Sequence, residues 1–76
     1  MKLEAEILEE IRILSLYNLD SMQQGIKVHS NADNLCIEAA KRLYEKGITT
    51  LPDGGYLTDL GHEAAEHAQG LLRILD

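Results

Sequence analysis

The chain has little of several features that would place it in a specialised class. It contains one cysteine in 76 residues, so no disulfide can form within the chain, and a reducing compartment is the simpler expectation. No apolar run approaches the roughly 18 residues that a transmembrane helix needs. The N-terminal stretch is rich in glutamate, which is wrong for a secretory or transit peptide. The sequence therefore predicts a cytoplasmic protein with no membrane partner.

Basic residues are also scarce. The chain has 7 Lys and Arg against 13 Asp and Glu, for a formal net charge of −6. Residues 51–70 contain no Lys or Arg, whereas residues 41–50 carry three basic side chains and one acidic one. Binding to a phosphate backbone is driven largely by Lys and Arg. The chain offers only one modest basic patch for such binding.

The length and composition of the chain predict one domain, spanning residues 1–76. The hydrophobic fraction of 45% is ordinary for a folded protein. A chain of this length buries only about 60% of the surface that it exposes when unfolded. So small a core stabilises the chain only weakly, and contact with a second subunit would therefore add stability.

One stretch in the second half predicts a helix end, a hairpin and the start of another helix. Gly47 suits the left-handed position just after a helix, and residues 48–51 are short and β-branched. Residues 52–55 (Pro-Asp-Gly-Gly) supply turn chemistry. A second strand follows near residues 55–58, and Thr58 is a good N-cap for the last helix.

Periodicity places three helices and one further strand along the chain. Helices are predicted for Leu3 to about Tyr17, for Ser30 to Lys46 with Ser30 as the cap, and for Asp59 to about Leu75. The alternating residues 25–29 predict a short strand that pairs with the hairpin. In this order the elements make an α+β, winged-helix-like domain. Its small antiparallel sheet has strands near 25–29, 48–51 and 55–58.

Periodicity also assigns the helix faces. On the outer face of the second helix, pairs four residues apart are expected, Glu38 with Arg42 and Lys41 with Glu45. The predicted buried stripes are Leu3, Ile7, Ile11 and Leu14 in the first helix, Ala32, Leu35, Cys36, Ala39, Ala40 and Leu43 in the second, and Leu60, Ala64, Ala68, Leu71 and Leu75 in the last. The predicted outward polar stripe of the last helix is His62, Glu66, Gln69 and Arg73.

The first and last helices are more apolar than one buried face requires. Ile13, Leu16 and Tyr17 lie off the main stripe, and a helix that is apolar all round is buried on more than one side. Such residues either contact a second subunit or turn the chain back into its own core, and both interpretations stay open. A homodimer through these two helices would use Ile13, Leu16, Tyr17, Leu72, Ile74 and Leu75.

No catalytic or metal-binding constellation stands out. A zinc-binding helix needs two histidines four residues apart, whereas His62 and His67 are five apart and point about 140° away from each other. Cys36 lies on the apolar arc of its helix, where a free thiol packs as a small hydrophobe. The sequence shows no nucleophile with a matching base and no phosphate-binding glycine loop. We therefore expect no enzyme, no metal and no cofactor.

Nucleic-acid binding is the remaining candidate that the residues themselves suggest. Asn34 would read a base edge if the second helix entered the major groove, and the basic side chains nearby would contact phosphates. The predicted nucleic-acid-binding residues are Lys27, His29, Asn34, Lys41, Arg42 and Lys46. The acidic Asp53 at the hairpin tip counts against this interpretation, as do two glutamates on the outer face of the helix.

The hairpin region resembles the wing of bacterial winged-helix regulators of the multiple-antibiotic-resistance type. The resemblance rests on Leu43, Gly47-Ile48, Gly55-Tyr56-Leu57-Thr58 and Gly61, with one residue fewer after Gly47. Most of the chain is similar to a short, functionally uncharacterised gammaproteobacterial family, whose members are often labelled as DNA-binding or transcription-regulator proteins. That similarity rests on residues 25–29, 42–47, 52–58 and 63–69. A departure from full winged helices is that only one helix lies between the first strand and the hairpin.

Two functions follow from these patterns. The first is a small non-enzymatic, DNA-associated or transcription-regulator-type protein that uses the basic strip, as the resemblance implies. The second is an acidic homodimeric module for protein–protein interaction that keeps the fold and does not bind DNA. The expected partners are accordingly a second copy of the chain, DNA, or another protein.

Overall fold

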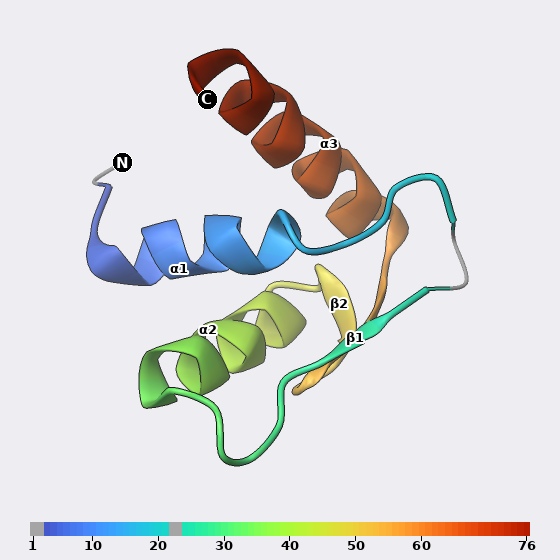
Figure 1. The fold of residues 1–76 in the computed structure, drawn as a ribbon. Coiled ribbons are helices and arrows are strands. Elements are labelled where there is room, and N and C mark those ends of the chain that lie inside the picture. The colour runs from blue at the N-terminus through green and yellow to red at the C-terminus, as the bar shows by residue number, and fades with distance from the viewer. Residues whose placement is uncertain (1–2, 22–23) are drawn as a thin grey trace.

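The computed structural model describes residues 3–21 and 24–76. The elements follow one another as α1 (Ala5–Leu14), β1 (Ile26–Lys27), α2 (Asn34–Glu45), β2 (Thr49–Leu51), β3 (Gly54–Leu57) and α3 (Asp59–Leu75) (Figure 1). Three helices and a small three-stranded antiparallel sheet make an α+β fold, which confirms the predicted class. None of the described helices has the length and apolar character required to cross a bilayer.

The sheet has the strand order β1-β3-β2, so that β3 is central and the first strand joins the hairpin as predicted. Ile26 lies opposite Gly55, and the amide of Val28 donates to the carbonyl of Asp53 at 2.8 Å just beyond β1. The hairpin turns at Pro52-Asp53, and the two glycines that follow have φ angles of 120° and 70°. Only glycine adopts such angles without strain. Strands β1 and β2 are shorter than the predicted ranges, whereas β3 has the predicted length and begins one residue earlier.

Helix α1 ends earlier than predicted, at Leu14, and the chain turns over residues 15–17. This turn carries Tyr17 into the core, where its hydroxyl donates to the carbonyl of Gly55 at 3.1 Å. The buried face of α1 is shifted from the predicted stripe. Leu14 is buried as predicted and Ile7 and Ile11 are half-buried, but Leu3 lies outside the helix and is exposed, and Ile13 is in the core.

Helix α2 begins at Asn34, and Asp33 is its cap, because the Asp33 side chain accepts from the amide of Leu35 at 2.9 Å. The prediction that Ser30 caps this helix was wrong: residues 30–31 form a turn. The predicted inward arc is confirmed at Cys36, Ala39, Ala40 and Leu43, all of which are buried, whereas Leu35 is exposed.

Helix α3 has the predicted bounds, and Thr58 caps it by accepting from the amide of Gly61 at 3.0 Å. Its predicted core face is confirmed at Ala64 and Ala68, which pack against the core, and was wrong at its leucines. The two buried residues of α3 are Gly61 and Ala65, whereas Leu60 and Leu71 are exposed. The helix backbone comes so close to the hairpin that a Cβ on Gly61 would lie 2.0 Å from the carbonyl oxygen of Ile48. Small residues therefore make the closest contact, and the larger ones beside them turn outward.

Helices α1, α2 and α3 enclose one core with the sheet. Its buried hydrophobic residues are Ile13, Leu14, Tyr17, Cys36, Ala39, Ala40, Leu43 and Ala65. Residues from β1, from β3 and from the segment just before β2 pack around it, among them Ile26, Ile48 and Leu57. The hairpin and the first strand are thus tied to the helices by shared apolar packing, which fixes the surfaces described below.

We expect Gly61→Ala to destabilise the domain by about 1–3 kcal/mol, because the added methyl group meets backbone that cannot rotate away. Gly70→Ala on the same helix is the matched control. A Cβ at Gly70 meets nothing within 4 Å, and replacing an interior helical glycine by alanine stabilises by about 0.5–1 kcal/mol. Urea unfolding followed by circular dichroism measures both changes. Equal stability of the two variants would contradict the close contact.

Candidate nucleic-acid and protein interaction surfaces

Two of the six predicted nucleic-acid-binding residues are paired with one buried carboxylate. Arg42 donates from Nε to Oε2 of Glu10 at 2.8 Å, and Lys46 donates from Nζ to Oε1 at 2.5 Å. Glu10 is buried, with only 5% of its surface exposed. Arg42 also donates to the backbone carbonyl of Glu6 at 3.2 Å. These two cations therefore join α2 to α1.

The electrostatics of Glu10 follow from two opposing effects. Burial raises the pKa of its carboxyl, but hydrogen bonds and charge attraction from Lys46 and Arg42 outweigh burial, so that the pKa lies below its usual value. The group is consequently ionised at neutral pH, and its charge is matched by cations on both oxygens. Removing either side of such a buried cluster leaves charge without a partner.

The remaining ion pairs on α2 also differ from the prediction. Lys41 pairs with Glu38 at 3.1 Å, three residues back, and not with Glu45. Because Arg42 reaches across to α1, the predicted pair of Glu38 with Arg42 was wrong. The pair of Lys41 with Glu38 is half exposed on both sides, and pairs of that kind are worth little in water.

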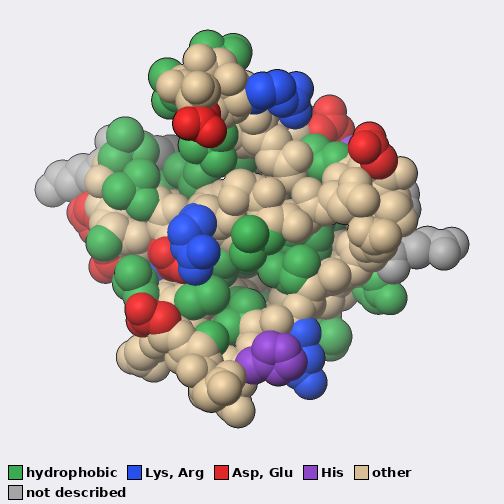
Figure 2. All heavy atoms as spheres, viewed as in Figure 1, with side chains coloured by type: hydrophobic (Ala, Val, Ile, Leu, Met, Phe, Trp, Pro, Cys, Tyr) green, Lys and Arg blue, Asp and Glu red, His purple; other side chains and the backbone are tan. Residues whose placement is uncertain are grey.

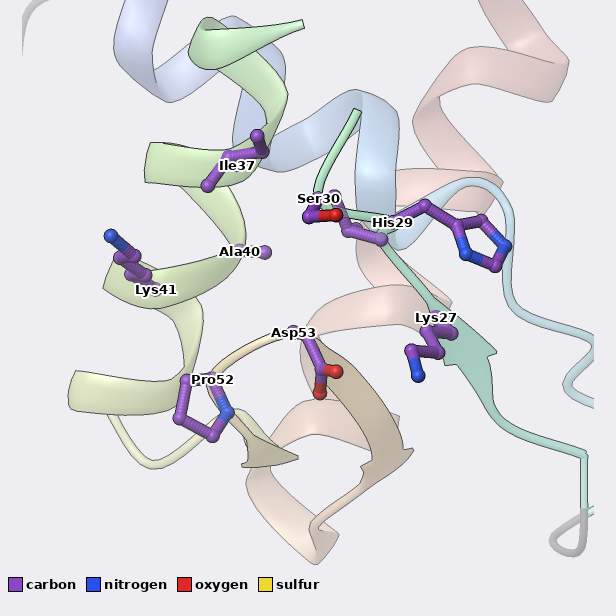
Figure 3. Close-up of a pocket in the computed structure, with 9 residues that line it drawn as sticks. Lys27, His29, Ser30, Ile37, Ala40, Lys41, Pro52 and Asp53 are labelled. Atoms are coloured by element: carbon purple, nitrogen blue, oxygen red, sulfur yellow. The ribbon is translucent and has the colours of Figure 1, made fainter. Parts of the chain in front are cut away.

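An open groove of about 570 Å³ gathers three of the predicted basic residues. It lies between α2, the end of β1 and the hairpin tip (Figure 3). Lys41 stands on the helix side and Lys27 on the strand side, with Asp53 between them. The lining residues are Lys27, Val28, His29, Ser30, Ile37, Ala40, Lys41, Pro52 and Asp53. Asn34 is exposed at the start of α2 and does not line the groove.

The basic side chains do not form a continuous strip on the face shown in Figure 2. Lys and Arg side chains stand apart there, with acidic and hydrophobic side chains between them. The two cations that would have joined the groove to a longer strip, Arg42 and Lys46, are paired with Glu10. The predicted strip is therefore divided into a structural pair and a small groove.

The predicted dimer residues also fall into two groups. Ile13 and Tyr17 are 1% and 3% exposed and belong to the core of the chain itself, so they are not available to a second subunit. Leu16, Leu72, Ile74 and Leu75 are exposed. For Tyr17, the alternative interpretation of a residue that turns back into its own core is confirmed, and its burial raises the pKa of the phenol to about 12.

Gln69 has a role that the pattern did not predict. It was expected on the outer polar stripe of α3, yet its side-chain amide donates to the carbonyls of Leu14 and Tyr17 at 3.1 and 2.7 Å. Carbonyls at a helix end have no partner within the helix. Gln69 thus supplies hydrogen-bond donors to two carbonyls at the end of α1, although it lies more than fifty residues later in the chain.

Other titratable side chains support no further site among the described residues. Burial raises the pKa of the Cys36 thiol, which lowers its reactivity. His62 pairs with Glu66 through Nδ1 at 2.8 Å, an ordinary contact across one helical turn. Residues 3–21 and 24–76 contain no group of three His, Cys, Asp or Glu side chains placed to hold a metal ion.

Glu10→Gln tests the buried carboxylate. We expect it to lower the free energy of unfolding by an amount on the order of 2 kcal/mol at neutral pH, because two cations lose their anion. Glu38→Gln removes a surface pair and should cost under about 1 kcal/mol. Because the pKa of Glu10 is lowered in the folded state, its contribution is full above the ordinary value of 4.5 and is lost as pH falls below it.

The free energy of unfolding of both variants and of the unchanged protein is measured by urea unfolding across pH 3–8. The stability gap between the unchanged protein and Glu10→Gln should be constant at neutral pH and should narrow in acid. A gap that does not depend on pH would show that the carboxylate charge is not what holds α1 to α2.

The comparisons with known proteins give a family but no activity. A family model, DUF5669, described as a family of unknown function, matches residues 1–76. No curated protein and no solved structure matches the chain. Because the family match extends over the whole sequence, the chain belongs to DUF5669, a family of unknown function.

Proposed function

We propose that the protein is a small, non-enzymatic, winged-helix-like module that self-associates and acts through protein–protein contacts. The observation that carries the proposal is the end of α3. Residues 71–76 are all exposed, although four of them are leucine or isoleucine. Ile74 and Leu75 are the extreme cases, with 82% and 73% of their surface in water. Contiguous apolar surface of this kind marks interaction sites in soluble proteins.

The geometry around α3 supports a second copy as the occupant. The C-terminal turns of α3 rise away from α1, α2 and the sheet (Figure 1). Beside them lies the turn after α1, which Gln69 holds in place and which carries the exposed Leu16. Pairing two such surfaces about a twofold axis would bury the same residues on both copies. It would also extend a core that is small for an isolated domain.

DNA binding is the second candidate, and two observations favour it. The strand order β1-β3-β2 places a hairpin at the sheet edge in the manner of a wing. Lys27 and His29 make no side-chain hydrogen bond or ion pair with the residues that the structure describes. Against it stand the pairing of Arg42 and Lys46 with Glu10 and the exposed Glu38 and Glu45 on α2. We therefore place protein association first.

Sedimentation equilibrium tests self-association. The unchanged chain is expected to be a dimer. The double variant Ile74→Glu/Leu75→Glu should be a monomer, because a dimer interface would bury its two new carboxylates without partners. Its circular dichroism spectrum should be the same as that of the unchanged chain. Leu60→Glu is the matched control, since Leu60 is exposed at the other end of the same helix. A strictly monomeric unchanged chain at about 1 mM, where even weak pairs associate, would refute the dimer.

A titration with duplex DNA separates the two functions. We expect no change in the anisotropy of a labelled mixed-sequence duplex at low salt, because two lysines beside one acid neutralise few phosphates. Binding that weakens steeply as salt is added would instead establish the DNA-associated function. Lys27→Glu should then abolish that binding, while Arg73→Glu, with the same charge change on α3, should leave it intact.

A further inference from the structure

The groove between α2, β1 and the hairpin tip has an apolar floor. Val28 comes from the segment after β1, Ile37 and Ala40 from α2, and Pro52 from the turn. The fold fixes the position of each of these residues. Val28 is held by its hydrogen bond to Asp53 and Pro52 by the tight turn of the hairpin, while the other two belong to α2. The floor is therefore formed in advance, and a ligand gains apolar contact without ordering the protein.

The rim of the groove carries a charge opposite to that of the chain. Lys27, His29 and Lys41 lie on it against one acid, Asp53, whereas the whole chain has a net charge of −6. Lys27 and His29 have no side-chain hydrogen bond or ion pair with the described part of the chain. Lys41 forms an ion pair with the half-exposed Glu38, and the exchange of such a pair for another anion costs little free energy. Lys27 and Lys41 are thus available to an anion, unlike Arg42 and Lys46.

The geometry points to an acidic peptide segment of a partner protein as the ligand of this groove. One or two aliphatic side chains of the segment pack on Val28, Ile37 and Pro52, and a flanking carboxylate pairs with Lys41 or Lys27. The groove is open to solvent along one side, which suits a length of chain that continues past it. A duplex offers few apolar groups for the floor, and Asp53 would repel its closely spaced phosphates.

This inference deepens the proposed function, because it gives the module a second surface and a chemical class of partner. The groove is made by β1, α2 and the hairpin, and none of its lining residues belongs to α3. Self-association through α3 and peptide binding in the groove can therefore succeed or fail separately. The variant Ile74→Glu/Leu75→Glu keeps the groove unchanged and is expected to bind peptide like the parent chain.

Three synthetic peptides provide the probe: Gly-Asp-Leu-Leu-Glu-Gly, its amide counterpart Gly-Asn-Leu-Leu-Gln-Gly, and Gly-Asp-Ser-Ser-Glu-Gly, which lacks the aliphatic pair. Each is titrated into the ¹⁵N-labelled full chain to about 2 mM, a range that covers weak peptide binding. We expect saturable shifts of the amides of residues 27–30, 37–41 and 53 with the first peptide. The other two should bind at least about threefold more weakly, since each lacks one of the two contacts.

Charge reversal in the protein completes the test. Lys41→Glu and Lys27→Glu should each weaken binding of the acidic peptide at least about threefold. Arg73→Glu makes the same charge change on α3 and should leave the affinity unchanged. The basic peptide Gly-Lys-Leu-Leu-Arg-Gly should bind Lys41→Glu more tightly than it binds the parent chain. All variants are first checked by circular dichroism for an unchanged fold.

Four results would overturn the inference, and three of them concern the peptides. They are the absence of saturable shifts at the highest peptide concentration, shifts confined to α3, and equal binding of the acidic and the amide peptide. A fourth is a duplex that shifts the same groove residues at lower concentration than the peptide does, which would assign the groove to nucleic acid. A monomeric parent chain with normal peptide binding would refute only the dimer.

Discussion

The buried carboxylate of Glu10, with a cation on each of its oxygens, is the interaction on which the arrangement of the helices depends. It joins α1 to α2 across more than thirty residues of sequence. An ionised group is expensive to bury, and only close partners make it tolerable. The position of α1 on α2 is therefore tightly specified, because a displacement would leave the buried Glu10 carboxylate without its cations. The same contact pairs two cations that the surface would otherwise offer to an anion, and so limits what the surface can bind.

Much of the fold was predictable because its signals are local. The turn residues after β2, the cap at Thr58 and the left-handed glycine after α2 each act within a few positions of the chain. The strand order also followed, since a hairpin leaves one edge of β3 for β1. The leucines of α3 were wrongly assigned to the inward face, because large apolar residues were assumed to mark the core. In fact the nearest approach belongs to Gly61 and Ala65.

The candidate surfaces were less predictable, because they depend on contacts between distant residues. Spacing within α2 favoured local ion pairs, and nothing in that pattern points to a glutamate on another helix. One signal was present: Glu10 lies four residues before the buried Leu14 and therefore on the inward side of α1. Of the predicted nucleic-acid-binding residues, the groove collects Lys27, His29 and Lys41. Asn34 is the first residue of α2 and lies outside the groove, which is lined by residues further along that helix.

The amide of Gln69, bound to two carbonyls at the end of α1, has a consequence for how the chain acquires its structure. The turn that places Tyr17 in the core is completed by a side chain made more than fifty residues later. Because synthesis starts at the N-terminus, α1 is made before α3. The carbonyls of Leu14 and Tyr17 therefore lack this partner until α3 has been made and has packed beside them. The end of α1 is thus completed only by the arrival of α3.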